Sequence, residues 1–437
     1  MNQSGNELHR TKFPFWKSFL TSFAIGGFLT SSLPPQAQAE MVDSPKVVVD
    51  EVWQIINHEF VDRNFNQIDW IKKREELLEK KYSNKQQAYR AINQALKDLG
   101  DPYTRFLAPE QFESLTNQTS GEVSGVGIRI AVDPRTQDLY IIDTIRKSPA
   151  EEAGLRRGDR IVRIDGKPTA LMDLDQASEA LKGELGTDVR LEITRKDQPA
   201  FSVSVTRAQF EVPSVDFAMK KEGELNIGYI KLEEFSSHAA EQMQKAIKEL
   251  NQQKAQGFVL DLRGNPGGLL FASVDIARMW MSEGEIVDIV DRRGGHQTFS
   301  ADNSAITDLP LVVLVDGDSA SASEILAGAL KENSRATIVG TTTFGKGTVQ
   351  SVHSLSDGSG LAVTISRYYP PSGTNINKKG IAPDIFQALS REEQYLLSKD
   401  PSLVATKADS QYAKAIAILR TVGKSNQNNS NSASILN

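Results

Sequence analysis

Between residues 227 and 383, short apolar runs alternate with amphipathic segments, and no other pattern in the chain restricts its fold as strongly. Alternation of this kind predicts a largely parallel sheet with crossover helices. The run 309–315 is almost entirely apolar, as expected for a strand buried on both faces. Ligands of such sheets bind where the strands end at their carboxyl side, so the loops there hold the candidate site. The predicted strands cover residues 227–232, 258–262, 285–290, 311–315 and 336–339, and the predicted helices cover 238–251, 271–281 and 323–330.

Two differently patterned regions precede this core. Residues 47–99 carry apolar side chains at helical spacing, which predicts a small helical bundle or arm with Ser83 or Asn84 as a helix N-cap. Residues 121–206 carry short β-branched runs between turns, which predicts a separate β-rich module. The predicted strands of this module cover 123–132, 139–145, 160–164 and 189–194, and its short helices cover 149–154 and 174–182.

The segment after residue 387 has a charged, helical pattern to about Val422. From Gly423 onward serine and asparagine dominate, which is typical of a disordered stretch. The predicted fold class is therefore a multidomain α/β and α+β chain with a mostly parallel sheet in its core. The helical arm and the C-terminal helix have two open uses, as a homodimer interface or as elements that pack on their own core.

The composition excludes several classes of function. The chain has no cysteine, which removes disulfides, thiol nucleophiles and cysteine-ligated metals. Its five histidines are scattered, so an HExxH zinc motif is absent and a histidine-based triad has few candidates. The formal net charge of −6 argues against general binding of nucleic acid. Neither a metal nor another cofactor is expected.

The N-terminal residues have the pattern of a secretory signal peptide. Basic residues precede the apolar stretch 18–33, and a small-residue A-x-A site follows at 37–39. We therefore expect residues 1–39 to be removed and the mature protein to work outside the cytoplasm, where nucleotide is scarce. The alternative is an uncleaved anchor that leaves the protein associated with the membrane.

A loop of small residues joins the predicted strand 311–315 to the predicted helix 323–330. It contains Ser319, Ser321 and Ser323. Amide groups and the dipole at a helix N-terminus favour a developing oxyanion, so a serine there is a candidate nucleophile. An ordinary serine-rich N-cap is the alternative.

The loop 340–348 is similar to a Walker A loop, but Gly347 stands where that loop needs a magnesium-binding hydroxyl. The β-branched residues that follow favour a strand, whereas a P-loop needs a helix, so no nucleotide partner is expected. Lys346 has a different use, because burial against an apolar sheet disfavours its ammonium form. A neutral lysine can deprotonate a serine, in a Ser–Lys variant of the catalytic triad. A surface lysine in a glycine-rich loop is the alternative.

Three motifs occur in a fixed order: DLRGNPGG at 261–268, SASASE at 319–324 and FGKG at 344–347. In this order they resemble the motifs of carboxyl-terminal processing proteases, also called tail-specific proteases, which occur in bacteria and chloroplasts. The resemblance extends from residue 99 to residue 384. Taken alone, the glycines of the first motif would indicate only a tight turn.

The resemblance implies a role for individual residues of these motifs. It makes Ser321 the nucleophile and Lys346 the general base. Gln350 is the supporting polar residue after the lysine, and Glu324 helps to hold the site. The two backbone amides that it assigns to the oxyanion hole are those of Gly267 and Ala322.

The β-rich module is similar to a PDZ domain. Gly125-Val126-Gly127-Ile128 matches the loop whose amides hold the terminal carboxylate of a peptide, with the peptide added as an extra strand. The segments 148–150 and 153–155 also fit the PDZ pattern. The resemblance therefore implies that the substrates are proteins or peptides with free C-termini.

Together these features predict an exported serine endopeptidase that cleaves proteins near their C-termini, in a periplasm or a thylakoid lumen. The rival is an exported, catalytically inactive PDZ scaffold that binds peptides, although both Ser321 and Lys346 are intact. The predicted parts are a signal peptide (1–39), an N-terminal helical region (40–103), a PDZ domain (104–207), a Ser/Lys protease core (208–390), and a C-terminal helix with a disordered tail (391–437).

Overall fold

The computed structural model describes residues 44–434, with side chains described as far as residue 422. The predicted signal peptide, residues 1–39, lies outside the described residues. No helix within the described range is long and apolar enough to cross a membrane.

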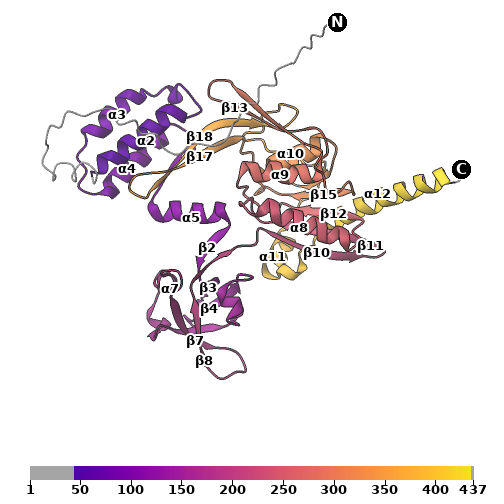
Figure 1. Cartoon of the computed structure of the whole chain (residues 1–437), viewed down its shortest axis with the longest axis horizontal. Coiled ribbons are helices and arrows are strands. Elements are labelled where there is room, and N and C mark those ends of the chain that lie inside the picture. Colours follow the sequence, from indigo (N-terminus) through magenta and orange to yellow (C-terminus); the bar gives the residue numbers. More distant parts are fainter. Residues whose placement is uncertain (1–43, 435–437) are drawn as a thin grey trace, which may run out of the picture. The chain divides into compact units, whose positions relative to one another are not determined.

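The N-terminal region is helical, as predicted. Asn84 is the N-cap of its last helix, because the Asn84 side chain accepts a hydrogen bond from the N–H of Gln87. The apolar faces of these helices bury residues such as Ile56 together with Leu361 from strand β18 (Gly360–Tyr369), so the region packs on its own chain. The helices, drawn in indigo in Figure 1, are α2 (Pro45–Glu59), the 3-10 turn η1 (Phe65–Gln67), α3 (Trp70–Glu79) and α4 (Lys85–Asp98).

A helix and a two-stranded ribbon connect this region to the β-rich module. Helix α5 (Pro109–Ser120) ends at Gly121, whose left-handed φ of 71° closes the helix. Strand β2 (Glu122–Gly125) then pairs antiparallel with β9 (Ala208–Glu211). The chain therefore enters and leaves the module through adjacent strands.

The β-rich module is an antiparallel sheet in the order β3-β4-β5-β7-β8. The predicted single strand 123–132 is in fact β2 and β3, because the chain leaves the extended pairing at Val126 and Gly127. Strand β8 was not predicted. Strand β3 lies at the sheet edge, so one of its sides has no partner strand among the described residues. The elements are β3 (Ile128–Val132), β4 (Leu139–Thr144), α6 (Pro149–Glu152), β5 (Arg160–Ile164), β6 (Lys167–Pro168), η2 (Thr169–Leu171), α7 (Leu174–Leu181), β7 (Asp188–Thr194) and β8 (Phe201–Thr206).

The predicted α/β core is a six-stranded sheet in the order β10-β11-β12-β15-β16-β19. All neighbours from β11 to β19 are parallel, and only the edge strand β10 is antiparallel. The strands are β10 (Val215–Glu222), β11 (Leu225–Leu232), β12 (Gly257–Asp261), β15 (Leu311–Val315), β16 (Thr337–Gly340) and β19 (Ile385–Phe386).

Helices cover both faces of this sheet, which explains why β15 is apolar along its whole length. Val313 packs with the helices α8 (Ala239–Gln252), α9 (Leu270–Trp280) and α10 (Ala322–Glu332). Val312, one residue earlier, faces the opposite side and packs with the C-terminal helix. Successive strand residues point to opposite faces, so both sets of side chains are buried.

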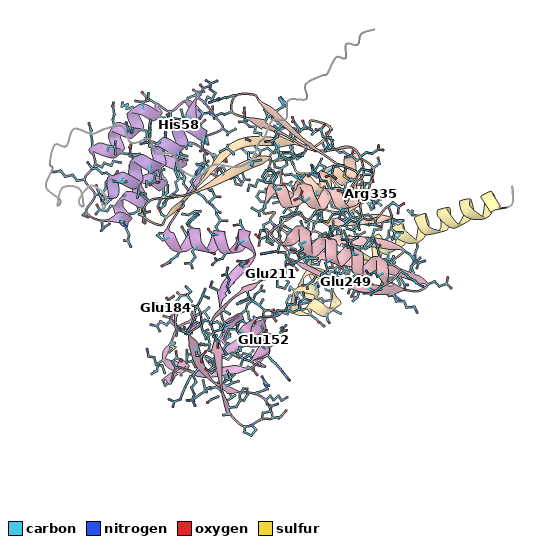
Figure 2. The ribbon with its side chains drawn as sticks, in the orientation of Figure 1. His58, Glu152, Glu184, Glu211, Glu249 and Arg335 are labelled. Atoms are coloured by element: carbon cyan, nitrogen blue, oxygen red, sulfur yellow. The ribbon has the colours of Figure 1, made fainter. Side chains whose placement is uncertain are left out.

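Arg335, labelled in Figure 2, lies shortly before β16 and bonds to neighbouring segments. Its guanidinium donates to the carbonyl oxygens of Trp280 at 2.5 Å and of Leu309 at 3.0 Å. Trp280 ends α9 and Leu309 precedes β15, so one cation links three segments. Because charge-assisted hydrogen bonds are stronger than neutral ones, Arg335 stabilises the sheet end opposite the loops described below.

A second sheet corrects one of the sequence predictions. Residues 285–290 were expected in the parallel sheet, but β13 (Glu285–Asp291) turns back directly into β14 (His296–Ser300) through Gly294 and Gly295. Without a crossover helix the two strands must be antiparallel. The sheet also contains β1 (Arg105–Leu107), β17 (Thr348–Ser354) and β18 (Gly360–Tyr369).

The C-terminal part begins with α11 (Arg391–Lys399), followed by η3 (Pro401–Leu403) and α12 (Ser410–Ser434). Tyr412 and Ile416 of α12 pack on the outer face of the core sheet. Helix α12 continues past Gly423 to Ser434, and the predicted disorder of the tail stays a prediction. Helix formation is cooperative, so a helix that is already formed and packed extends at little cost into residues of low helix propensity.

A buried ionic cluster joins α12 to the core. The guanidinium of Arg263 donates to Asp261 at 2.6 Å and to Asp409 at 2.8 Å, and both carboxylates are almost completely buried. Burial alone would raise the pKa of Asp261, but Arg263 and Lys231 lower that pKa to about 2. The cluster therefore holds the loop that follows β12, residues 262–268, against the start of the C-terminal helix.

We expect Arg263→Met to destabilise the fold by about 3–5 kcal/mol, because it leaves buried Asp409 without its cation and buried Asp261 with only Lys231, 3.7 Å away. Arg160→Met is the matched control, since Arg160 pairs with Asp138 while half exposed and should cost at most about 1 kcal/mol. Denaturant unfolding measures both. Equal midpoints for the two variants would contradict a stabilising role for the cluster.

Candidate active site

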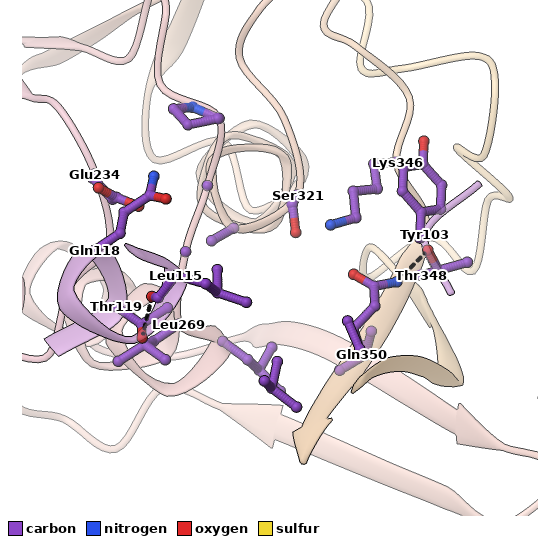
Figure 3. Close-up of a pocket in the computed structure, with 18 of the residues that line it drawn as sticks. Tyr103, Leu115, Gln118, Thr119, Glu234, Leu269, Ser321, Lys346, Thr348 and Gln350 are labelled. Atoms are coloured by element: carbon purple, nitrogen blue, oxygen red, sulfur yellow. Dashed lines mark hydrogen bonds between the residues drawn. The ribbon is translucent and has the colours of Figure 1, made fainter. Parts of the chain in front are cut away.

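Three loops meet at the carboxyl ends of the adjacent strands β12, β15 and β16. Backbone hydrogen bonds join them: Ala320 N–H donates to Asn265 O at 3.0 Å, and Phe344 N–H donates to Ser319 O at 3.1 Å. Beside the loops lies a pocket of about 390 Å³. Figure 3 shows the side chains that converge on it. The parallel strand order thus brings the three sequence motifs together.

The structure distinguishes between the three serines of the SASASE motif. The hydroxyls of Ser319 and Ser323 donate to the carbonyl oxygens of Leu262 and Asn265, at 2.8 and 3.0 Å, and both serines are fully buried. Ser321 lines the pocket, and its hydroxyl makes no hydrogen bond with any described residue. Only Ser321 therefore has a hydroxyl available to a ligand.

Ser321 occupies a strained position at the start of α10. Its φ of 56° and ψ of −113° are unusual for a residue with a Cβ atom. The strain is held by its surroundings: Ser321 N–H donates to Glu324 at 2.9 Å, and the Tyr368 hydroxyl donates to Ser321 O at 3.1 Å. Strained residues of this kind cluster at functional sites, and here the strain exposes the hydroxyl at a helix N-terminus.

Lys346 points toward Ser321 across the pocket (Figure 3). Its ammonium nitrogen makes no hydrogen bond or ion pair with a described residue, and it lies 5.0 Å from the centre of the Tyr103 ring. Burial lowers the pKa of Lys346, and the nearby charge of Arg105 lowers it further, against the opposing effects of Asp101 and Glu324. A lysine in this setting is suited to accept a proton.

Glu324 joins the loop that contains Lys346, after β16, to the loop that contains Ser321, after β15. Its carboxylate is fully buried and accepts from Ser321 N–H and Lys346 N–H, each at 2.9 Å. The other oxygen accepts from Gly345 N–H at 2.7 Å and from the Thr343 hydroxyl at 2.6 Å. Because one carboxylate bonds both catalytic candidates through their backbones, Glu324 fixes their separation.

Gln350 lies close to the same pocket but is not bonded to the lysine side chain. Its amide nitrogen donates to the hydroxyls of Thr348 at 2.9 Å and Thr364 at 3.2 Å. These bonds leave the carbonyl oxygen of the Gln350 side chain directed into the pocket on the side of Lys346 (Figure 3). The structure thus places Gln350 beside the pair without joining it to them.

The two backbone amides expected to form the oxyanion hole are neighbours, but they differ in whether their N–H group already has a hydrogen-bond acceptor. A Cβ atom built on Gly267 would lie 3.0 Å from the nitrogen of Ala322, so the two amides are close. The N–H of Ala322 has no acceptor among the described residues. The N–H of Gly267 instead donates to the side chain of Asn265 at 2.8 Å. In this arrangement only Ala322 offers a free donor.

Sequence reasoning missed several residues that line the pocket. The most unusual is Glu234, which follows β11 and lies beside the Gly267 loop, since Phe235 N–H donates to Gly267 O at 2.9 Å. Burial raises the pKa of Glu234 to about 7. No motif identifies this position. The other missed lining residues used below are Tyr103, Arg105, Val352, Ala362 and Tyr368.

The predicted peptide-binding loop has free amides at the open edge of the β-rich module. Val126 O and Gly127 O accept from Ala150 N–H and Ile145 N–H, both at 2.9 Å, which fixes the loop. The N–H groups of Val126 and Gly127 have no acceptor within residues 44–434. Gly125 precedes them with a φ of 150°, and Ile128 follows as the first residue of the edge strand β3.

Comparison with known proteins matches the chain to two families and to several named relatives. The family model described as Peptidase family S41 matches residues 226–386, and the PDZ domain model matches residues 141–195. A protein named carboxyl-terminal-processing protease from Synechocystis sp. is 40% identical over 408 residues, which covers 93% of both chains. A chloroplastic C-terminal processing peptidase from Tetradesmus obliquus is 39% identical over 370 residues, covering 81% of this chain and 79% of the other.

A solved structure described as a photosystem II D1 C-terminal processing protease is also similar. It is 39% identical with a TM-score of 0.51, and the match covers 79% of this chain and 93% of that chain. Fold, site and matches together define a serine-type peptidase that carries a PDZ domain. The chain belongs to the carboxyl-terminal processing proteases of peptidase family S41, which confirms the resemblance found in the sequence.

Proposed function

We propose that this protein is an exported endopeptidase that cleaves protein substrates near their C-termini with Ser321 and Lys346 as a catalytic dyad. The observation that carries the proposal is the pair itself: an unbonded serine hydroxyl at a helix N-terminus faces a half-buried lysine that pairs with no acid of residues 44–434. An inactive scaffold would need neither a lysine whose pKa is lowered by burial nor a strained serine.

The reaction follows from the atoms present. Lys346 takes the proton of the Ser321 hydroxyl, and the serine oxygen attacks the peptide carbonyl carbon. The tetrahedral intermediate collapses when the lysine ammonium gives that proton to the departing amine. Water then attacks the acyl-enzyme with Lys346 again as base, which frees the acid product and restores the serine. Glu324 acts through the backbone and is a positioning residue.

The oxyanion would be stabilised by backbone amides. Ala322 offers its N–H directly, whereas the N–H of Gly267 must first leave Asn265. Gly267 has a φ of 107°, and a glycine can change its backbone angles at little cost. We infer that substrate binding completes the oxyanion hole by releasing Gly267.

The free amides of Val126 and Gly127 support capture of a substrate tail by the PDZ module. A carboxylate accepts hydrogen bonds from such paired amides, and the open edge of β3 can take the tail as an added strand. The partner is therefore a protein or peptide with a free C-terminus. We place the reaction in a periplasm or thylakoid lumen, because the N-terminal pattern indicates export and relatives occur in cyanobacteria and chloroplasts.

We expect Gly127→Ala to weaken binding of a free-acid peptide by about tenfold or more. An added Cβ would lie 2.1 Å from the Cβ of Ser148, and φ is already 82°. Gly186→Ala is the matched control, since Gly186 has a φ of 81° but nothing within 4 Å of its added Cβ. Fluorescence anisotropy with a labelled peptide measures both, and equal affinities would contradict a role for the loop.

The proposal is tested by incubating the predicted mature protein, residues 40–437, with a substrate. The substrate is an unstructured protein that ends in a free apolar C-terminus. Intact-mass spectrometry should show a substrate shortened at its C-terminal end. The same substrate with an amidated C-terminus should be cleaved more slowly, because its tail has lost the carboxylate. Binding without any cleavage would instead establish the scaffold alternative.

A further inference from the structure

The active-site pocket continues beyond the dyad along one face of the second sheet. Val352 of β17 is paired with Ala362 of β18, and Ala362 is paired on its other side with Arg105 of β1. Directly paired residues of antiparallel strands have their side chains on the same face. All three residues line the pocket that contains Ser321, which confirms that this row faces it.

The row is connected to the dyad through β17. Gln350 and Val352 are two residues apart, so their side chains share a face, and both line the pocket. Lys346 lies just before the start of this strand. The pocket wall thus runs from Lys346 past Gln350 to Val352, and then across two strand spacings, about 10 Å, to Arg105.

The middle of this wall is apolar and its far end is cationic. Val352 is 46% exposed although it is apolar, so its surface is available to a ligand side chain. Arg105 is exposed, and its guanidinium makes no hydrogen bond or ion pair with any residue of the described range. The nearest acid along the chain, Asp101, is occupied by the Thr104 hydroxyl at 2.6 Å and by Tyr103 N–H.

The direction of catalysis assigns this wall to one half of the substrate. Lys346 must deliver a proton to the departing amine, so the segment that leaves lies on the lysine side of Ser321. Glu234, the acid of the pocket, lies instead beside the Gly267 loop. The leaving segment therefore meets an apolar surface and an unpaired cation, and a C-terminal tail carries a carboxylate at its end.

We propose that Arg105 binds the terminal carboxylate of the leaving tail and so fixes how many residues from the C-terminus Ser321 cuts. The inference rests on the proposed function. A single carboxylate cannot occupy two sites at once, so the PDZ loop and Arg105 would bind the same terminus in succession. The substrates that fit have a short apolar tail with a free carboxylate.

Peptides whose last residues are a run of alanines provide the test, because all bonds in the run are chemically equivalent. The wild-type protein should cut at a constant number of residues from the free terminus when the run is lengthened by one, two or three alanines. Arg105→Gln should cut at scattered positions, and its kcat/KM should fall about tenfold for the free acid relative to the amide. Mass spectrometry reads both results.

Three controls separate this inference from its alternatives. Arg105→Lys keeps the cation and should keep most of the register, and Arg90→Gln removes an exposed arginine of α4 and should change nothing. Gly127→Ala weakens PDZ capture, so a free-acid preference that persists there must come from the pocket. Rates are compared at high pH, because loss of the Arg105 charge raises the pKa of Lys346.

Two results would overturn the inference: a wild-type cut that stays at one sequence position when the tail is lengthened, or an Arg105→Gln variant that cuts in the wild-type register. If Arg105→Gln cleaves no peptide, two other results test the inference. The wild-type cut should keep its distance from the lengthened C-terminus, and Arg105→Lys should cut at that same distance. Failure of the proposed function has a different signature, since the wild-type protein would then cleave no peptide or Ser321→Ala would still cleave.

Discussion

Replacing Ser321 by alanine should lower kcat/KM for a cleaved peptide by at least about 10³-fold. The alanine has no atom that can form the acyl-enzyme, and no other described hydroxyl in the pocket combines free hydrogen-bonding capacity with a helix N-terminus. Peptide binding should be unchanged, because the free amides of Val126 and Gly127 lie in the loop between β2 and β3 and not in the Ser321 pocket. Single-turnover assays by mass spectrometry, together with anisotropy titrations, measure the two effects.

The matched control is Ser323→Ala, two residues further along the same motif. The Ser323 hydroxyl donates to Asn265 O at 3.0 Å and is fully buried. Its loss should cost about 1 kcal/mol of stability but leave the chemistry in place. Near-normal cleavage by Ser321→Ala would rule out Ser321 as the nucleophile, and near-normal cleavage by a folded Ser323→Ala would show that the loss is specific to Ser321.

The core sheet could be predicted because its strands have a distinctive sequence pattern, with apolar residues at successive positions. Val312 and Val313 are both apolar although they face opposite sides, and only a strand buried on both faces requires this. Parallel connections then force the loops after β12, β15 and β16 to one edge, so Ser321 and Lys346 could be placed together before the structure was known. The choice of Ser321 over its neighbours came from the resemblance and not from periodicity.

The parts of the fold and of the site that could not be predicted depend on contacts that local sequence patterns do not encode. β13 has the composition of a core strand, and only its tight turn into β14 sends it to the other sheet. The row of Arg105, Ala362 and Val352 needs the register of strands separated by more than 200 positions, which no local pattern encodes. The capture of the Gly267 amide by Asn265 depends on a side-chain rotamer that the motif does not specify.

The pH profile of cleavage should rise from acid to alkaline pH, because Lys346, the proposed base, can accept a proton only when it is neutral. Burial and the charge of Arg105 lower the pKa of Lys346, so its neutral fraction at a given pH exceeds that of an exposed lysine. Below this lowered pKa, kcat/KM should fall about tenfold for each pH unit. Lys346→Arg should be inactive, by about 10³-fold or more, across the whole profile, since a guanidinium keeps its proton.

Glu234 is the group most able to imitate this profile, because its pKa of about 7 also lies within the measured range. Ionisation of Glu234 on raising the pH would give a limb of the same sign if the carboxylate assisted binding. Glu234→Gln removes that ionisation and leaves Lys346 in place, so the rising limb should persist in this variant. Arg105→Gln should move the limb to higher pH, because it removes a positive charge that disfavours the ammonium form. A limb that disappears with Glu234, or a profile that stays flat between about pH 5 and about 9, would show that Lys346 is not the base.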